Sequence, residues 1–466
     1  MKEKPVDLKV GVKPVFVQLV HSGPYEGPCR VGRREDLEPE AERARGEEEF
    51  KRFGEELREN LSPEARVLEP VKIEWRDDWV VPEEEFGKLE ADLEDVDLFV
   101  ISGGLSQYPA VAVAHRYKKP VAMVGAVVNM DVAACLRARG LEGYAPLDLQ
   151  ELNQLISLLR VRKAVSRTKV LYATEGDVVP VGVVSTIWDL ENLRVRFGVE
   201  HISVPARALL GRMDRLSQDE EREAQELTDE LIKNADQVHM AREELLRSVR
   251  FYVTVKKAME ELECNAFVIP CFEVCASRLA EERRVTFCLA HSLLKDEGYP
   301  SACEGDMNVL MAMALLMYIS KKSAYMGNSY IVDREENILG VNHDVPGLRM
   351  KGLGGPALPY EIRNFTFGGW GATIRYDFSK DVGEPVTLAR FNPTATRLLG
   401  ARGEICGGVG FDRIGCSLGV QVKVGDVAEL LHREADFGHH LAVVYGDYTQ
   451  ELKEAGKVMK FDVEEV

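Results

Sequence analysis

The first 165 residues alternate short apolar runs with charged, helix-like segments. The apolar runs are KPVFVQLV at 13–20, DLFVISGGL at 97–105 and KPVAMVG at 119–125. Continuous apolar strands separated by helices are typical of a parallel sheet that is covered on both faces. The pattern therefore predicts a parallel α/β domain over residues 1–165.

A second β/α unit begins near Thr168. Its predicted strands are TKVLYATEG from 168, VEHISVP at 199–205 and NAFVIPCF at 265–272. Between them, Ser217 and Glu220 form a predicted capping box that opens a charged helix reaching about Arg247. The unit ends with the short strand PSAC and the apolar helix MNVLMAMALLMYIS at 307–320.

Beyond residue 325 the pattern changes to short β runs separated by turn residues. Examples are NSYIVD, ILGVNH, ATIRYDF, EPVTLARFN and SLGVQVKVG. Regular short strands of this kind indicate an antiparallel barrel or sandwich. We expect an α/β protein with two doubly wound parallel-sheet domains, 1–165 and 166–325, followed by a β-rich, barrel-like domain at 326–466.

Composition narrows the classes of partner. The chain has 466 residues, with 77 acidic and 59 basic side chains and a formal charge of −18. A surface this negative repels phosphate backbones and anionic lipids, so nucleic acid and membranes are not expected partners. The N-terminus lacks the apolar core of a secretory signal, and nine cysteines without a CxxC pair support no disulfide framework. We expect a cytoplasmic protein with mostly reduced, buried cysteines.

Three acidic or imidazole side chains stand at the ends of predicted strands in the second half of the chain. Glu304 lies between the strand PSAC and the apolar helix, where Asp306 is a plausible N-cap. Ligands bind at such carboxyl ends of strands in open α/β sheets. Asp333 and His343 end two consecutive predicted strands, so a hairpin places both at one rim. Capping by Glu304, turn formation by Asp333 and a structural His343 are the alternatives.

The pair His439-His440 precedes the apolar strand LAVVYG. Neighbouring residues on a strand point to opposite faces, so only one of the two histidines is expected to join a given site. Together, Glu304, Asp333, His343 and His440 offer carboxylate oxygens and imidazole nitrogens. This set suits Mn²⁺, Mg²⁺ or Co²⁺ better than a thiolate-seeking Zn²⁺.

The combination of these motifs resembles the L-fucose isomerase and L-arabinose isomerase superfamily. The resemblance rests on Tyr299-Pro300-Ser-Ala-Cys-Glu304-Gly-Asp306 before the Met-rich helix, then Gly327-Asn328, Asp333, His343 and the terminal Gly-His-His440. It covers about residues 265–345 and 436–463, whereas the first 260 residues agree only in their β/α texture. Asp333 is similar to the fucose branch and His343 to the arabinose branch, with a shorter spacing between the two.

The resemblance implies a divalent metal, typically Mn²⁺, and interconversion of aldoses and ketoses through an enediol. It implies that Glu304 and Asp333 are both catalytic acid–base groups and metal ligands, with His440 as third ligand and His343 as either a fourth ligand or a substrate contact. Two positioned carboxylates suit proton transfer between C1 and C2, and a metal stabilises the developing enediolate. A small sugar substrate and a homo-oligomer, trimeric or hexameric, are further expectations.

Two other interpretations stay open at this point. One is a metal-dependent enzyme of other carbohydrate chemistry on the same scaffold, namely an epimerase, aldolase or dehydratase, because a fold does not fix a function. The other is a non-catalytic sugar-binding protein, whose binding would survive loss of the metal. Substrate profiling with and without metal separates the three.

Overall fold

The computed structural model describes residues 4–25, 32–76, 80–174 and 185–466. It divides into two compact units, Leu8–Arg160 and Val161–Val466, the latter joined by the N-terminal segment that ends at Asp7. The three-domain division expected from the sequence stays a prediction, although its first boundary lies close to this one. Among the described residues, no helix is long and apolar enough to cross a membrane.

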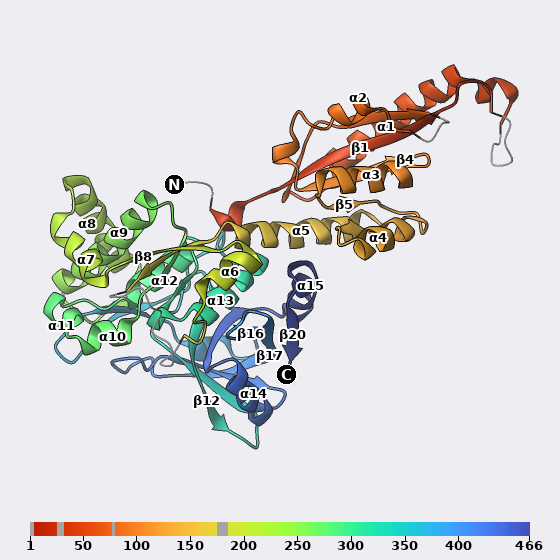
Figure 1. Cartoon of the computed structure of the whole chain (residues 1–466). Coiled ribbons are helices and arrows are strands. Elements are labelled where there is room, and N and C mark those ends of the chain that lie inside the picture. The colour runs from red at the N-terminus through yellow and green to blue at the C-terminus, as the bar shows by residue number, and fades with distance from the viewer. Residues whose placement is uncertain (1–3, 26–31, 77–79, 175–184) are drawn as a thin grey trace. The chain divides into compact units, whose positions relative to one another are not determined.

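The Leu8–Arg160 unit contains a parallel sheet with strand order β2-β1-β4-β5-β6, in which β3 also pairs with β1. Strand β1, which pairs with β2, β3 and β4, is almost completely buried, as a continuous apolar run predicts. Helix α1 packs on β1, and α4 packs on β6 (Figure 1). The elements are β1 (Val10–Val20), α1 (Pro39–Asn60), β2 (Ala65–Val67), β3 (Val71–Arg76), α2 (Glu83–Gly87), β4 (Leu98–Gly103), α3 (Gln107–Tyr117), β5 (Val121–Ala122), α4 (Asn129–Ala138), β6 (Gly143–Tyr144) and α5 (Leu149–Ser166), in which the boundary falls.

The other unit opens with a second parallel sheet, ordered β11-β10-β7-β8. Its strands are β7 (Lys169–Ala173), β8 (Glu200–Val204), β10 (Ala266–Val268) and β11 (Ser301–Ala302). The accompanying helices are α6 (Leu190–Phe197), α7 (Ala206–Gly211), α8 (Gln218–Asn234), α9 (Arg242–Glu261), α10 (Cys271–Ala276), α11 (Leu279–Arg283), α12 (Cys288–Asp296) and α13 (Met307–Ser320). The two parallel sheets confirm the α/β part of the predicted fold class.

The charged helix that begins at Ser217 is shorter than predicted. The capping box of Ser217 and Glu220 is present, with both reciprocal hydrogen bonds. The helix ends at Asn234, however, and does not reach Arg247. The next residues form β9 (Gln237–Val238), which pairs with β14 (Glu361–Asn364), a strand of the second half of the chain. This long-range pairing interrupts a segment whose local pattern is helical throughout.

The C-terminal part is a barrel-like β sheet, as predicted. Strands run in the order β16-β19-β12-β13-β18-β17, and β16 also pairs with β17, so six antiparallel strands form a closed ring. Strand β20 extends β17 in parallel. The barrel strands are β12 (Tyr325–Asp333), β13 (Ile338–Asn342), β16 (Pro385–Phe391), β17 (Arg397–Val409), β18 (Gly419–Val424) and β19 (His440–Tyr445). The remaining elements are β14 (Glu361–Asn364), β15 (Ala372–Arg375), α14 (Val427–Arg433), α15 (Thr449–Met459) and β20 (Asp462–Glu465).

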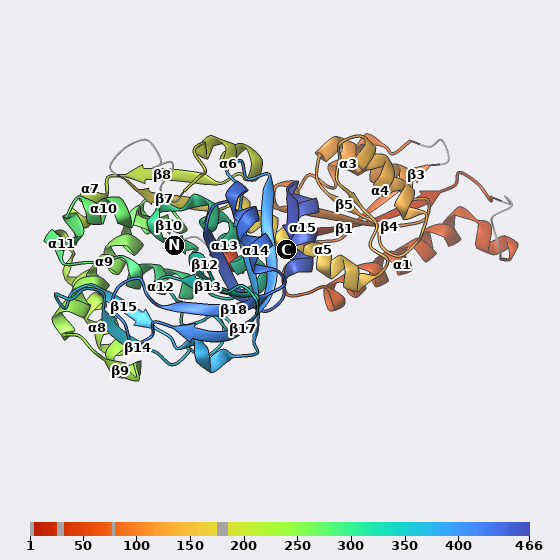
Figure 2. The same ribbon diagram turned by 90° about the horizontal axis from the view of Figure 1, so that it is seen from below.

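The Met-rich helix α13 joins the second parallel sheet to the barrel. Residues Met307 to Tyr318 are all buried, as expected for a helix that is apolar on every side. It contacts β11 at its start and packs against β12, β16 and β19 along its length (Figure 2). The carboxyl end of β11 is thereby brought beside the adjacent barrel strands β12 and β19. This junction contains the candidate site.

Candidate metal centre

Three of the predicted ligands meet at the junction of α13 and the barrel. Glu304, His343 and His440 each offer one ligand atom, and these atoms all lie within 4.8 Å of one another. His343 Nε2 is 3.3 Å from Glu304 Oε1, and His440 Nε2 is 3.8 Å from Glu304 Oε2. Both histidines are fully buried, whereas the Glu304 side chain is 18% exposed. Among the described residues, this cluster is the only group of three or more His, Cys, Asp or Glu side chains that could hold a metal ion.

Glu304 sits in an unusual backbone conformation. It lies in the short turn Cys303–Gly305 between β11 and α13, with φ 57° and ψ 21°. A left-handed conformation is unfavourable for a residue with a side chain, and such residues concentrate at functional sites. Burial would raise the pKa of Glu304, but the hydrogen bond from His343 and the neighbouring histidines outweigh it and lower that pKa. An ionised carboxylate therefore faces the two imidazoles.

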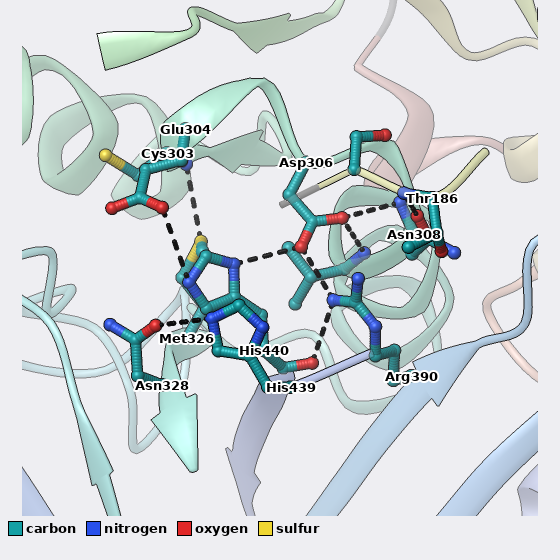
Figure 3. A network of polar contacts seen from close by, with 12 residues as sticks. Thr186, Cys303, Glu304, Asp306, Asn308, Met326, Asn328, Arg390, His439 and His440 are labelled. Carbon is teal, nitrogen blue, oxygen red and sulfur yellow. Dashed lines mark hydrogen bonds and ion pairs between the residues drawn. The ribbon is translucent and has the colours of Figure 1, made fainter. Parts of the chain in front are cut away.

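Asp306 orients His440 through Nδ1, the ring nitrogen that does not face Glu304 (Figure 3). Its Oδ2 is 2.9 Å from His440 Nδ1 and also accepts a hydrogen bond from Arg390 at 2.6 Å. Its Oδ1 accepts the amide protons of Asn308 and Val309 and so caps α13, as predicted. Burial would raise the pKa of Asp306, but Arg390 and His440 lower it to about 2. The ionised Asp306 thus holds a proton on Nδ1 of His440.

The other ring nitrogen of His440 is the atom that best indicates a metal. His440 Nε2 is buried and has no hydrogen-bond partner in the described part of the chain. With the proton on Nδ1, this nitrogen presents a lone pair toward Glu304. A carboxylate that fixes the tautomer of a histidine is the usual second partner of a metal-binding imidazole. One carboxylate and two imidazoles fit a divalent cation.

Only His440 of the histidine pair belongs to the cluster, as predicted, but His439 does not face the opposite side as strand alternation predicts. The His439 and His440 rings are 4.7 Å apart, and His439 Nε2 donates to Asn328 Oδ1 at 2.8 Å (Figure 3). The alternation rule fails because β19 begins at His440, so His439 belongs to the preceding turn, where Gly438 has φ 99°. The sequence marks Asn328 only as part of the Gly327-Asn328 motif. Its position opposite His440 in the β12–β19 pairing could be found only from the fold.

Asp333 is not part of the cluster. The predicted hairpin of β12 and β13 is present, but Asp333 pairs with Ile338 beside the turn, while Asn342, just before His343, pairs with Asn328. The C-terminal ends of the two strands of a hairpin lie at opposite ends of the hairpin. Asp333 is five residues beyond Asn328 on an extended strand, which corresponds to about 16 Å. It is exposed, and its Oδ1 accepts the amide protons of Glu335 and Glu336, the turn chemistry considered as an alternative.

The position of Asp333 leads to a clear expectation for its substitution. Asp333→Asn leaves the metal cluster untouched, so turnover and Mn²⁺ affinity are expected to stay within about twofold of the wild type. Steady-state kinetics and a Mn²⁺ titration measure this. A loss of turnover above about tenfold in a folded variant would return Asp333 to the catalytic set.

The segment that follows His343 is fixed by the end of α12. Lys295 is fully buried, and its Nζ donates to the carbonyl of Val345. Asp296 accepts the amide protons of Leu348 and Arg349 at 2.8 and 2.9 Å. Burial lowers the pKa of Lys295 from its usual 10.5 to about 7. The ammonium form is therefore costly in the folded protein.

This buried lysine makes stability depend on pH. Between pH 7 and 10.5 the unfolded chain binds a proton on Lys295 that the folded chain lacks, so raising the pH favours the folded state. From pH 7 to 9, the free energy of unfolding of the wild type is expected to rise by about 2 kcal/mol relative to Lys295→Met. Urea unfolding of both proteins without metal, at the two pH values, measures the difference. If the free energy of unfolding of the wild type does not rise relative to that of Lys295→Met between pH 7 and 9, the burial argument is contradicted.

Comparison with known proteins supports an enzyme. No family profile matches the chain. The chain is 25% identical over 336 residues to the sulfoquinovose isomerases of Priestia aryabhattai and Priestia megaterium, covering 67% of this chain and 68% of each relative. It is 27% identical over 227 residues to the sulfoquinovose isomerase of Alkalicoccus urumqiensis, covering 47% of this chain and 48% of the relative. The similarity supports an isomerase that acts on sugars.

Proposed function

We propose that the protein is a divalent-metal-dependent aldose–ketose isomerase that works through an enediol. The carrying observation is the cluster of Glu304, His343 and His440, with ligand atoms within 4.8 Å of one another and a lone pair on the unpartnered His440 Nε2. The relatives named sulfoquinovose isomerase support the reaction class, because the names identify sugar isomerases. The metal and the enediol are our additions to that similarity.

The residues of the cluster have distinct roles in this proposal. Glu304, His343 and His440 would hold the cation, which we propose is Mn²⁺ or a related divalent ion. When bound, it supplies Lewis-acid stabilisation of negative charge that develops on the sugar oxygens, a contribution of several kcal/mol. Asp306 keeps His440 neutral and oriented, and Arg390 keeps Asp306 ionised.

Glu304 is also the proton acceptor in this proposal. Aldose–ketose conversion removes a proton from the carbon next to the carbonyl and returns it to the adjacent carbon. Glu304 has two carboxylate oxygens, so one could hold the cation while the other accepts the proton. Its partly exposed side chain meets a substrate arriving from solvent, whereas both histidines are buried. General acid–base catalysis of this kind contributes about 10²–10⁴-fold.

A substrate panel with metal control tests the proposal. Purified protein is assayed for ketose formation from sulfoquinovose, L-fucose, L-arabinose, D-arabinose and D-ribose, with Mn²⁺ and after removal of metal by a chelator. We expect ketose from at least one sugar, loss of the activity on chelation and its return on adding Mn²⁺. Ketose formation that persists in chelator contradicts the metal assignment. If metal is bound but no sugar of the panel yields a ketose, an epimerase, aldolase or dehydratase is favoured.

The assembly and compartment of the protein stay predictions. We propose a homo-oligomer, trimeric or hexameric, with a small sugar as substrate, on the resemblance described above. A cytoplasmic location without nucleic-acid or membrane partners rests on the sequence features and the charge of −18. Light scattering of the purified protein measures the subunit number directly.

A further inference from the structure

Two thiols lie in contact immediately beside the metal cluster. Cys303 Sγ is 3.4 Å from Cys271 Sγ, and Cys303 directly precedes Glu304. The two residues are 32 positions apart in the chain and meet because α10 packs on the Cys303–Gly305 turn. The pair plays no part in the proposed isomerisation, which uses only carboxylate and imidazole atoms.

The two thiols differ in their access to solvent. Cys303 is buried, at 1% exposure, whereas Cys271 is half-buried at the first residue of α10. A small oxidant therefore reaches Cys271 first, and Cys303 is the thiol in contact with it. A solvent-accessible cysteine beside a second cysteine that can resolve it is an arrangement found in thiols that are oxidised reversibly.

We propose that Cys271 and Cys303 form an oxidisable dithiol, converted by hydrogen peroxide to a disulfide that weakens metal binding at Glu304. This inference goes beyond the proposed function, and its effect on the metal rests on that function. Figure 3 shows Cys303 and Glu304 side by side at the cluster. Oxidation at this place thus acts on the metal centre without touching the two histidines.

The chemistry balances with peroxide as the oxidant. Hydrogen peroxide transfers one oxygen atom to the Cys271 thiol, which becomes a sulfenic acid, and one water is released. Cys303 Sγ then attacks the Cys271 sulfur, the S–S bond forms while the S–O bond breaks, and hydroxide leaves with the Cys303 proton as a second water. The two thiols lose two electrons and two protons, and the peroxide is reduced to two waters. A small dithiol reductant reverses the reaction by exchange.

We infer that formation of the bond shifts the Cys303–Gly305 turn and, with it, Glu304. A disulfide is about 2.05 Å long, so the two sulfurs must approach each other by about 1.4 Å from their present contact. Cys303 is buried, and its amide donates to Met326 Sδ at 3.3 Å, a contact that shifts with the turn. Glu304 follows directly in its strained left-handed conformation, so the displacement passes to its carboxylate. Coordination distances tolerate only about 0.2 Å, which is why we expect weaker metal binding.

Peptide mapping and a Mn²⁺ titration test the inference together. Wild-type protein without metal is treated with one equivalent of hydrogen peroxide, digested without reduction and analysed by mass spectrometry. We expect a peptide pair linked through Cys271 and Cys303, a Mn²⁺ dissociation constant at least tenfold higher than before oxidation, and recovery after dithiothreitol. Electron paramagnetic resonance of free Mn²⁺ gives the dissociation constant without any activity assay.

Two serine variants provide the controls. Cys271→Ser is expected to bind Mn²⁺ normally and to keep that affinity after peroxide. Cys275→Ser removes an exposed thiol four residues later on the same helix and should respond as the wild type does. Absence of the linked peptide, or a linked protein with unchanged Mn²⁺ affinity, overturns the inference. Failure of the reduced wild type to bind Mn²⁺ contradicts the proposed function instead, while the mapping still reports on the thiol pair.

Discussion

Glu304→Gln is expected to abolish turnover, with a loss of at least about 10³-fold, while the protein stays folded. The amide keeps the size of the side chain but removes both the negative charge that attracts the cation and the basic oxygen that accepts the proton. The Glu304 side chain is partly exposed, so the substitution leaves no uncompensated charge in the core. Ketose formation with saturating Mn²⁺ measures the loss, and circular dichroism confirms the fold.

The matched control for this variant is Glu335→Gln. Glu335 is an exposed glutamate in the turn between β12 and β13, remote from the cluster along the hairpin. It should retain wild-type activity within about twofold. Near-normal turnover by folded Glu304→Gln would remove Glu304 from the mechanism and with it the central role of the cluster.

Asp306→Asn is expected to weaken both the metal site and the fold. Without the carboxylate, His440 loses the acceptor that fixes its proton on Nδ1, and Mn²⁺ affinity should fall about 10- to 100-fold. Arg390, which is fully buried, loses its ion pair with Asp306, and the free energy of unfolding should fall by about 3 kcal/mol. Mn²⁺ titration and urea unfolding of the metal-free protein measure the two effects separately.

A double variant separates the two roles of Asp306. Arg390→Met added to Asp306→Asn removes the buried guanidinium that has lost Asp306, so part of the stability should return. The Mn²⁺ affinity should stay low, because His440 still lacks its carboxylate acceptor. If Asp306→Asn binds Mn²⁺ as tightly as the wild type, the orienting role of Asp306 is wrong.

The fold class could be predicted from the sequence because hydrophobic patterning is a local signal. Continuous apolar runs predicted the parallel strands, and short β runs with turns predicted the barrel. The apolar segment at 307–320 predicted a buried helix with an Asp306 cap, and both are present. The break after Asn234 could not be predicted, because it depends on pairing between β9 and β14, more than 120 residues later.

The candidate site was predictable only where a residue lay at the end of a parallel strand or matched a motif. Glu304, His343 and His440 were selected in this way, and the fold brings them together. Asp333 was placed near His343 by treating two strand ends as one rim, but consecutive strands of a hairpin end at opposite sides. Strand alternation predicts that His439 faces away from His440, but β19 begins at His440, so the rule does not apply to His439. Such errors of register are not visible in local patterns.

The most direct test of the account is the location of Mn²⁺ in a crystal of the protein, from anomalous scattering. We predict one strong peak about 2 Å from a Glu304 oxygen, His343 Nε2 and His440 Nε2, distances typical of divalent metal coordination in proteins. The peak should disappear in a Glu304→Gln crystal grown under the same conditions. A fully occupied Mn²⁺ elsewhere, with these three side chains uncoordinated, would contradict the metal-dependent isomerase proposed here.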